Sequence, residues 1–194
     1  MKASRLFAVI ALLSAAAVLF AGCAGITHEP TVDMSSLSAI DDSAFFDALN
    51  EIGIGKDDVK IMSDTSFSFA NDDRDYAIEI SLDATSEKGN QYSYTRCVDE
   101  ANAKALFEYY YDNYDQIFDA KDFSGISSHE VGSNTAYVLI DGRYDDKTTN
   151  LYTPYHDAIF LKGDTVIAVI ASDYELSIEK EVNDFLNALG YPHP

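Results

Sequence analysis

Apolar residues along this chain follow three spacings, and each spacing predicts a different kind of element. The first is an almost wholly apolar run over residues 6–21, which contains no charged residue. Farther along, apolar residues recur every three or four positions in some stretches and every second position in others. The spacing of three or four is typical of amphipathic helices, and the alternating one is typical of strands with one buried face.

Three helices are predicted, over 42–53, 99–118 and 178–190. Asp41 to Ser43 offer capping side chains for the first helix, and Asp99 offers one for the second. Glycine ends the first and third helices, as it commonly does because it adopts the left-handed conformation without strain. The core-facing positions are Phe45, Leu49 and Ile52; Ala103, Phe107, Tyr110, Tyr114 and Ile117; and Ile178, Val182, Phe185 and Leu189.

The first and third helices also end in similar sequences, over 47–54 and 184–191. In the first of these, Ile54 is expected to fold back onto Leu49 as the hydrophobic contact of a Schellman cap. An internal duplication would explain the similarity. Shared capping chemistry on two amphipathic helices explains it more simply, and we prefer that interpretation.

About six strands are predicted, and the clearest signal comes from a hairpin near the C-terminus. A two-residue turn at 163–164 would pair Leu161 with Val166 and Phe160 with Ile167. The predicted strands cover 66–69, 76–82, 92–96, 137–140, 158–161 and 166–171.

These elements predict a single α+β domain over 41–194, with a largely antiparallel sheet covered by three amphipathic helices. The strands are joined mostly by short turns, and such turns connect antiparallel neighbours. Val166 to Ile170 is continuously apolar, so both faces of that strand should be covered, with the second and third helices on opposite faces. The polar stretch 145–157 is expected to be a loop.

The N-terminal run is organised as a secretory signal that ends at a cysteine. Lys2 and Arg5 precede the apolar residues, and small residues lie immediately before Cys23. Phe20 to Cys23 resembles the lipobox of bacterial lipoproteins, in which the cysteine is lipidated and becomes the first residue after cleavage. We therefore predict a signal peptide over 1–22, lipidation of Cys23 and a flexible tether over 23–40. The alternative is an uncleaved membrane helix with an incidental cysteine.

The domain itself is similar to a diffuse group of uncharacterised bacterial lipoproteins. The resemblance implies a membrane-anchored, extracytoplasmic protein, and it brings no established activity and no functional residues. Five short motifs carry the resemblance. They are a helix ending in Leu-x-x-Ile-Gly at 49–53, a Tyr-rich strand at 92–96, an Ala-x-x-x-Phe helix at 103–107, an apolar hairpin at 158–171 and a closing Leu-Gly-Tyr at 189–191.

Charge narrows the choice of partners. The 194-residue chain has a formal net charge of −20, and removal of 1–22 leaves 11 basic residues against 33 acidic ones. Binding to nucleic acid needs clusters of Lys and Arg, so we expect no nucleic-acid partner. Anionic lipid would repel such a domain, so it should be held out into solvent from its anchor. Cys97 would be the one cysteine left unmodified, and it is expected to be a small buried hydrophobe.

Candidate chemistry is sparse. His28, His129, His156 and His193 have no second ligand at zinc spacing, and no catalytic motif is present, so we predict no metal, cofactor or catalytic residue. The segment 71–75 alternates oxygen ligands as calcium loops do, but it lacks the later Gly and Glu, so a solvated turn is the simpler interpretation.

The remaining candidate is the predicted loop over 145–157. Its rings at Tyr152, Tyr155 and His156 could bind a sugar or a peptide, or they could pack over a sheet edge. The sequence therefore predicts a lipid-anchored extracytoplasmic domain with a non-catalytic role in binding an unknown extracellular ligand or an envelope protein. A surface hydrolase acting on cell-wall or glycan material, with dispersed acidic and histidine residues, is the alternative.

Overall fold

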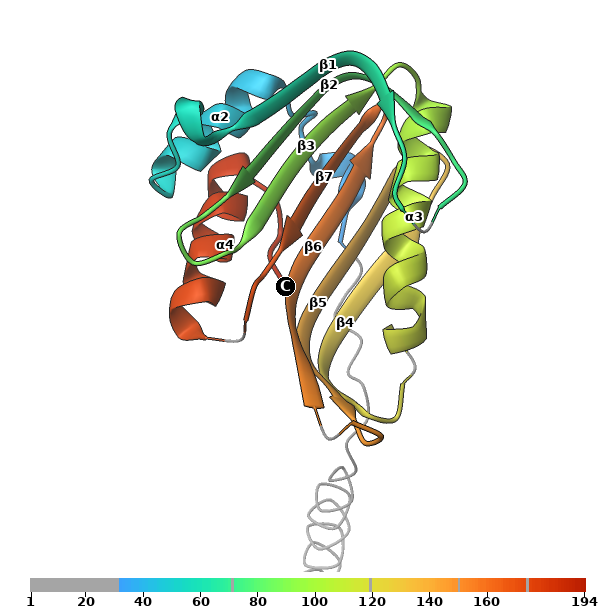
Figure 1. The fold of residues 1–194 in the computed structure, drawn as a ribbon, viewed down its shortest axis with the longest axis vertical. Coiled ribbons are helices and arrows are strands. Elements are labelled where there is room, and N and C mark those ends of the chain that lie inside the picture. The colour runs from blue at the N-terminus through green and yellow to red at the C-terminus, as the bar shows by residue number, and fades with distance from the viewer. Residues whose placement is uncertain (1–31, 71, 119, 150, 174) are drawn as a thin grey trace, which may run out of the picture.

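The computed structural model describes residues 32–70, 72–118, 120–149, 151–173 and 175–194. Within them a seven-stranded sheet has the order β1-β2-β3-β7-β6-β5-β4, and every neighbouring pair is antiparallel (Figure 1). The α+β class and the antiparallel sheet are as predicted, with one strand more than expected. The strands are β1 (Lys60–Phe67), β2 (Tyr76–Thr85), β3 (Gln91–Cys97), β4 (Phe123–Val131), β5 (Thr135–Asp146), β6 (Leu151–Lys162) and β7 (Thr165–Ile170).

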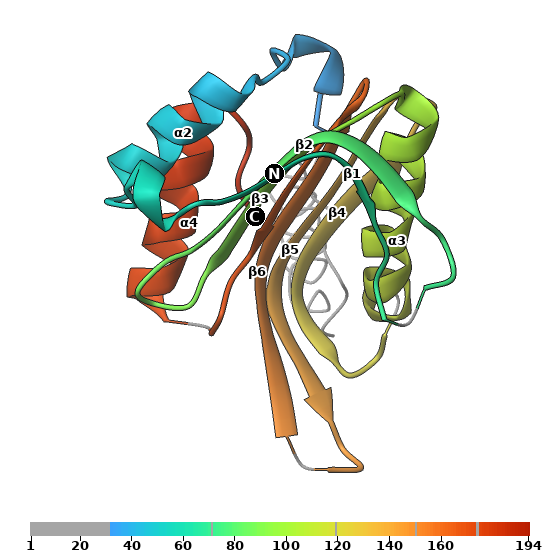
Figure 2. The ribbon, with the colours of Figure 1, turned by 45° about the horizontal axis from the view of Figure 1, so that its top comes forward.

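Helices cover both faces of this sheet. In the part of the chain that the structure describes, the α-helices are α2 (Asp42–Glu51), α3 (Glu100–Phe118) and α4 (Leu176–Leu189), with short 3-10 helices η1 (Met34–Ser36) and η2 (Lys56–Asp58). Figure 2 shows α2 and α4 together on one side of the strands and α3 on the other. Each side has its own apolar core, which we call the α4-side core and the α3-side core.

The hairpin of β6 and β7 lies in the middle of the sheet, as predicted. Leu161 pairs with Val166 and Phe160 pairs with Ile167, and Gly163 takes the positive φ of 62° that the turn requires. Phe160 and Ile167 belong to the α4-side core, whereas Leu161 and Val166 belong to the α3-side core. A strand buried on both faces has no need of polar alternation, which accounts for the continuous apolar run.

The predicted caps also form. Asp41 accepts a hydrogen bond from the Ala44 amide at 2.8 Å, and Asp99 accepts one from the Asn102 amide at 2.8 Å. The first and last helices end in the same way, because Ile54 N donates to Leu49 O and Tyr191 N donates to Leu186 O, each at 2.9 Å. The two ends therefore share a Schellman geometry, and the two helices pack against each other.

One expected regularity is broken inside β2. The alternation over 76–82 predicts one buried face, yet Tyr76 and Ile78 lie in the α3-side core whereas Leu82 lies in the α4-side core. The pairing of β2 with β3 shifts register between Ile78 and Ile80. A bulge at this point turns the side chains that follow to the opposite face.

Three strand assignments differ from the prediction. The first strand was predicted over 66–69, but β1 covers Lys60–Phe67, because its pairing with β2 and not the alternation of Phe67 and Phe69 sets its limits. β4 was not predicted, because it is an edge strand whose sequence has few apolar residues and whose inward positions include Ser127 and His129. The expected loop over 145–157 is wrong, because β5 and β6 remain paired from Thr135–Lys162 to Asp146–Leu151. Polar residues continue as strand here because backbone pairing along the hairpin does not require an apolar face.

The domain also starts earlier than residue 41. Met34 and Ile40 are buried in the α4-side core, and Lys162 Nζ donates to Met34 O at 2.8 Å. The C-terminal part of the predicted tether is therefore packed structure rather than a flexible link. The predicted signal peptide and Cys23 lie outside the described residues. In the described part of the chain, no helix combines the length and the apolar character that crossing a membrane requires.

Because β7 lies at the centre of the sheet, truncating its buried side chains should lower the stability of the domain. Ile167 is 1% exposed, so replacing it with Ala should lower the free energy of unfolding by roughly 2–5 kcal/mol. Tyr152 is 59% exposed on β6, so Tyr152→Ala should change it by less than about 0.5 kcal/mol. Urea unfolding of both variants tests the assignment, and equal stability of Ile167→Ala and the wild type would contradict it.

Candidate functional site

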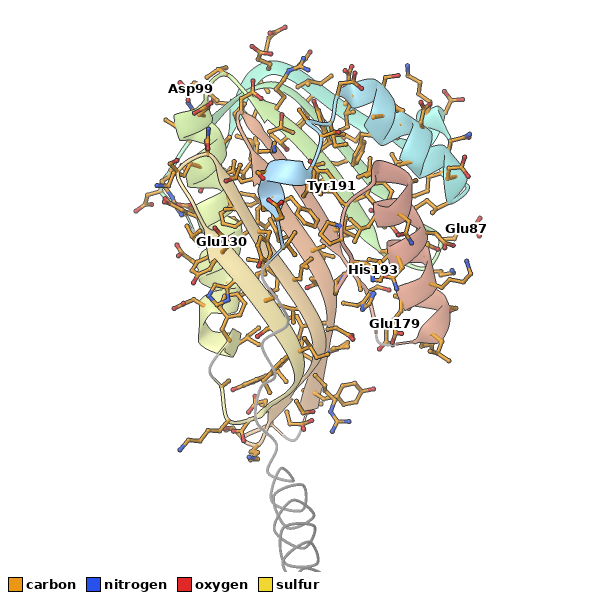
Figure 3. All side chains as sticks on the ribbon, turned by 180° about the vertical axis from the view of Figure 1, so that it is seen from behind. Glu87, Asp99, Glu130, Glu179, Tyr191 and His193 are labelled. Atoms are coloured by element: carbon orange, nitrogen blue, oxygen red, sulfur yellow. The ribbon has the colours of Figure 1, made fainter. Side chains whose placement is uncertain are left out.

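A cavity of about 270 Å³ opens on the face of the sheet that carries α4. Figure 3 shows this face, with Glu130 on β4 at one side and His193 and Glu179 toward α4 at the other. Five of its described lining residues are apolar, and the polar ones are Ser128, Asp141 and His193. The apolar lining residues are Val32, Ile126, Leu139, Pro192 and Pro194.

Asp141 is held in this wall by a hydrogen-bonded histidine. It lies opposite His156 in the β5–β6 pairing, and His156 Nδ1 is 3.1 Å from Asp141 Oδ1. The other ring nitrogen, Nε2, is 3.0 Å from Oδ1 of Asn183 on α4. The His156 side chain is 3% exposed and that of Asp141 is 30% exposed, so the carboxylate reaches the cavity while the imidazole lies behind it.

The surroundings of His156 favour its charged form. Burial by itself would lower the pKa of the imidazole, but the hydrogen bonds to Asp141 and Asn183 and the charge of Asp141 outweigh burial and raise it. Both ring nitrogens face oxygen acceptors, and the doubly protonated ring satisfies both. The pair therefore fixes the orientation of the Asp141 carboxylate.

A second chain of hydrogen bonds supports the cavity wall at Val32 and Ser128. Val32 N donates to the Tyr137 hydroxyl at 3.1 Å, and that hydroxyl lies 3.1 Å from Ser128 Oγ. These contacts join the N-terminal segment, β5 and β4. The cavity wall is thus assembled from segments that lie far apart in the sequence, since Val32 and its partner Tyr137 are separated by 105 positions and the residues after α4 also contribute.

Beside Asp141, two glycines expose backbone atoms instead of side chains at the surface of the sheet. Gly125 of β4 and Gly142 of β5 are register partners, and the next hollow along the sheet includes both glycines and shares Ile126 and Asp141 with the cavity. A Cβ atom on Gly142 would lie 2.6 Å from Ser124 O and 2.7 Å from Gly125 Cα. Only glycine fits where the backbones of two strands approach this closely.

The structure separates the three predicted ring residues. Tyr152 is exposed near the start of β6, with the Arg143 guanidinium 5.8 Å from its ring centre. Tyr155 is half-buried toward α3, where its ring lies 6.1 Å from that of Tyr114 and 6.4 Å from that of Phe123. Because neighbours on a strand face opposite sides, Tyr155 and His156 cannot form one surface. Of the three, His156 alone adjoins the cavity, through Asp141.

Sequence reasoning missed Asp141 and Asn183, which together hold His156. Asp141 directly follows the apolar run 137–140, which gave a local hint. Asp141 lies opposite His156 because of the β5–β6 register. The sequence did not predict that register, because the polar residues over 145–157 were interpreted as a loop.

Asp157, the residue after His156, is held by hydrogen bonds on the α3 side of the sheet. Asp157 is buried, and it accepts hydrogen bonds from the Tyr114 hydroxyl at 2.8 Å and from the Ala171 amide at 2.9 Å. Burial raises the pKa of Asp157 to about 6, because these two hydrogen bonds compensate only part of the lost hydration.

The other chemical candidates occupy structural positions. Asp72, from the segment considered for calcium, is 3.0 Å from Arg74 Nε and also bonds the Tyr76 hydroxyl; Asn71 lies outside the described residues. Cys97 is buried, and burial raises the pKa of its thiol to about 12. No group of three or more metal-binding side chains occurs within the described residues.

Comparisons of this chain with protein-family models, with curated proteins and with solved structures find no match.

The buried Asp157 predicts a pH dependence of stability. Its pKa is raised in the folded state from an ordinary value of 3.8, so its stabilising contribution is complete below about pH 4 and is lost as the pH rises through about 6. The loss should be on the order of 2–3 kcal/mol by pH 8. Asp157→Asn keeps the shape without the charge, so this part of the pH dependence should vanish.

Urea unfolding between pH 4 and pH 8 measures the effect. The exposed Asp115→Asn, next to Tyr114 on α3, is the matched control and should follow the wild type. Parallel pH profiles for Asp157→Asn and the wild type would show that Asp157 is not the titrating group.

Proposed function

We propose that this protein is a lipid-anchored, extracytoplasmic binding domain that holds a largely apolar ligand in the cavity next to Asp141. The observation that carries the proposal is a single oriented carboxylate in a mainly apolar cavity of about 270 Å³. Small-molecule sites typically combine an apolar lining with a few fixed polar groups. A ligand of matching chemistry has an aliphatic body and one hydrogen-bond donor that reaches Asp141.

The geometry of His156 favours binding over acid–base catalysis. A general base needs a nitrogen within hydrogen-bond reach of the substrate proton. Here Nδ1 faces Asp141, Nε2 faces Asn183, and the ring is buried behind the carboxylate. The arrangement suits an imidazole that positions Asp141. The proposal therefore keeps the non-catalytic role and makes hydrolysis the alternative.

Anchoring rests on the sequence before the described residues. The apolar run over 6–21 and the lipobox-like ending at Cys23 support export and lipidation, and two acyl chains give stable membrane attachment. Val32 follows Cys23 by nine residues, so at about 3.5 Å per residue it can lie no more than roughly 32 Å from the anchor. Since Val32 lines the cavity, the site would work close to the membrane surface, within reach of envelope components.

The anchor is tested by metabolic labelling with a radioactive fatty acid. The wild-type protein should incorporate label, and Cys23→Ala should not. Cys97→Ala removes the buried cysteine and serves as the matched control, which should stay labelled. Equal labelling of the wild type and Cys23→Ala would refute lipidation at this position.

The cavity is tested with 1-hexanol as the probe, because it has an aliphatic chain and one hydroxyl donor. We expect millimolar binding, seen as shifts of the Ile126, Ser128 and Leu139 amide resonances. Ile126→Trp should fill the cavity and abolish these shifts. Asp141→Asn should weaken binding by about fivefold, because a neutral acceptor is weaker than a charged one.

Val131→Trp is the matched control for this experiment. It lies on the same strand, is 48% exposed and falls outside the cavity lining, so binding should persist. Binding that survives Ile126→Trp would place the probe elsewhere and contradict the proposal.

A further inference from the structure

A second cavity, of about 220 Å³, lies on the α3 side of the sheet, where Asp83 of β2 and Ser93 of β3 are paired. Figure 1 shows this face, with α3 at one side and the turn between β2 and β3 at the other. Its floor contains polar side chains, and two aromatic rings form part of its wall. The polar floor residues are Asp83, Thr85, Gln91 and Ser93, and the rings are Phe69 and Tyr110.

Hydrogen bonds fix the Asp83 carboxylate in this floor. Ser93 Oγ donates to Asp83 Oδ1 at 2.7 Å, and Ser81 Oγ donates to Asp83 Oδ2 at 3.4 Å. Ser81 is in turn 3.1 Å from Thr95 Oγ1, so it is positioned from both sides. None of the ion pairs found among the described residues involves Asp83. Its partners are hydroxyl groups, which orient the carboxylate without neutralising its charge.

The two rings meet nearly at a right angle. The ring centres of Phe69 and Tyr110 are 6.1 Å apart with 72° between their planes. Tyr109 stacks on Phe69 at 3.8 Å and 4°, which holds the Phe69 ring in place. Burial first, and then the charge of Asp83, raise the pKa of the Tyr110 hydroxyl, so this ring stays neutral and lies close to the carboxylate.

We propose that this cavity binds an organic cation, specifically a methylated ammonium head group. Aromatic rings next to a carboxylate form the environment that quaternary ammonium groups prefer, because the ring quadrupole and the negative charge attract the same cation. The cavity is smaller than most small-molecule sites, so it suits a head group rather than a whole large ligand. The formal charge of −20 adds long-range attraction for cations.

A neutral sugar is the main competing ligand, since sugars also stack on aromatic rings. The observations favour the cation because the carboxylate charge in the floor is not neutralised by the hydroxyl groups that orient it. A neutral ligand would gain little from that charge. Asp83 and Asp141 lie on opposite faces of the sheet, so binding here does not depend on the proposed function of the other cavity.

The test compares choline with its neutral isostere 3,3-dimethyl-1-butanol. The full-length protein is titrated in micelles of a polyoxyethylene detergent, which contains neither ammonium nor sugar. Choline should shift the amide resonances of Thr85 and Ser93 with millimolar affinity, and the isostere should bind about tenfold more weakly. Raising the salt from 50 to 500 mM should weaken choline binding severalfold.

Substitutions test which residues of the cavity bind choline. Asp83→Asn keeps the serine hydrogen bonds but removes the charge, and it should weaken choline binding about tenfold. Phe69→Leu removes one ring and should weaken it about fivefold. Asp141→Asn is the matched control on the other face and should leave choline binding unchanged, while Asp83→Asn should leave 1-hexanol binding unchanged.

Three results would overturn the inference. Equal affinity for choline and the neutral isostere would mean that the cavity selects apolar shape rather than charge. Shifts of Thr85 and Ser93 with glucose but not with choline would identify a sugar site. Absence of choline-induced shifts in a folded wild-type protein would exclude the cation site altogether, whatever the outcome at Asp141.

Discussion

The structure depends on the burial of the β6–β7 hairpin on both faces. Phe160 and Ile167 point toward α2 and α4, while Leu161 and Val166 point toward α3. An isolated hairpin with two apolar faces would be insoluble in water, so it requires a helical layer on each side. This requirement explains why the chain supplies helices before, between and after its groups of strands.

Polar residues on β6, one strand of this hairpin, form hydrogen bonds to helices on both faces of the sheet. His156 and Asp157 are neighbours on β6 and point to opposite faces; His156 bonds Asn183 of α4, and Asp157 bonds Tyr114 of α3. Two residues before Asn183 on α4, Glu181 accepts hydrogen bonds from Asn90 and Tyr92 at 2.9 and 3.0 Å. Apolar packing supplies most of the stability, and these bonds set where each helix lies on the sheet.

The two cavities form where the sheet meets the edges of its helical layers. On the α4 side, β4 and β5 are lined by the N-terminal segment and the residues after α4, which leaves the cavity at Asp141. On the α3 side, β2, β3 and β7 contribute the floor of the cavity at Asp83. A seven-stranded sheet is wider than the helices packed on it, so open sheet on each face follows directly from the architecture.

The sequence by itself determined the parts of this protein that depend on neighbouring residues. Helix spacing, the caps at Asp41, Asp99, Gly53 and Gly190, and the Gly163 turn all act within a few positions, so a local pattern identifies them. The α+β class and the layer on each side of β7 follow from the same patterns. The lipobox-like ending at Cys23 is also a local signal, and it remains a prediction.

Only the tertiary structure decided the features that depend on pairing between distant residues. The bulge in β2, the edge strand β4 and the close approach of Gly125 and Gly142 are set by neighbouring strands, so local spacing does not encode them. Asp141 meets His156 through the β5–β6 register, and Asn183 reaches them from α4. Both candidate sites consist of such long-range contacts, because side chains converge in space according to strand register and helix placement rather than according to their distance along the chain.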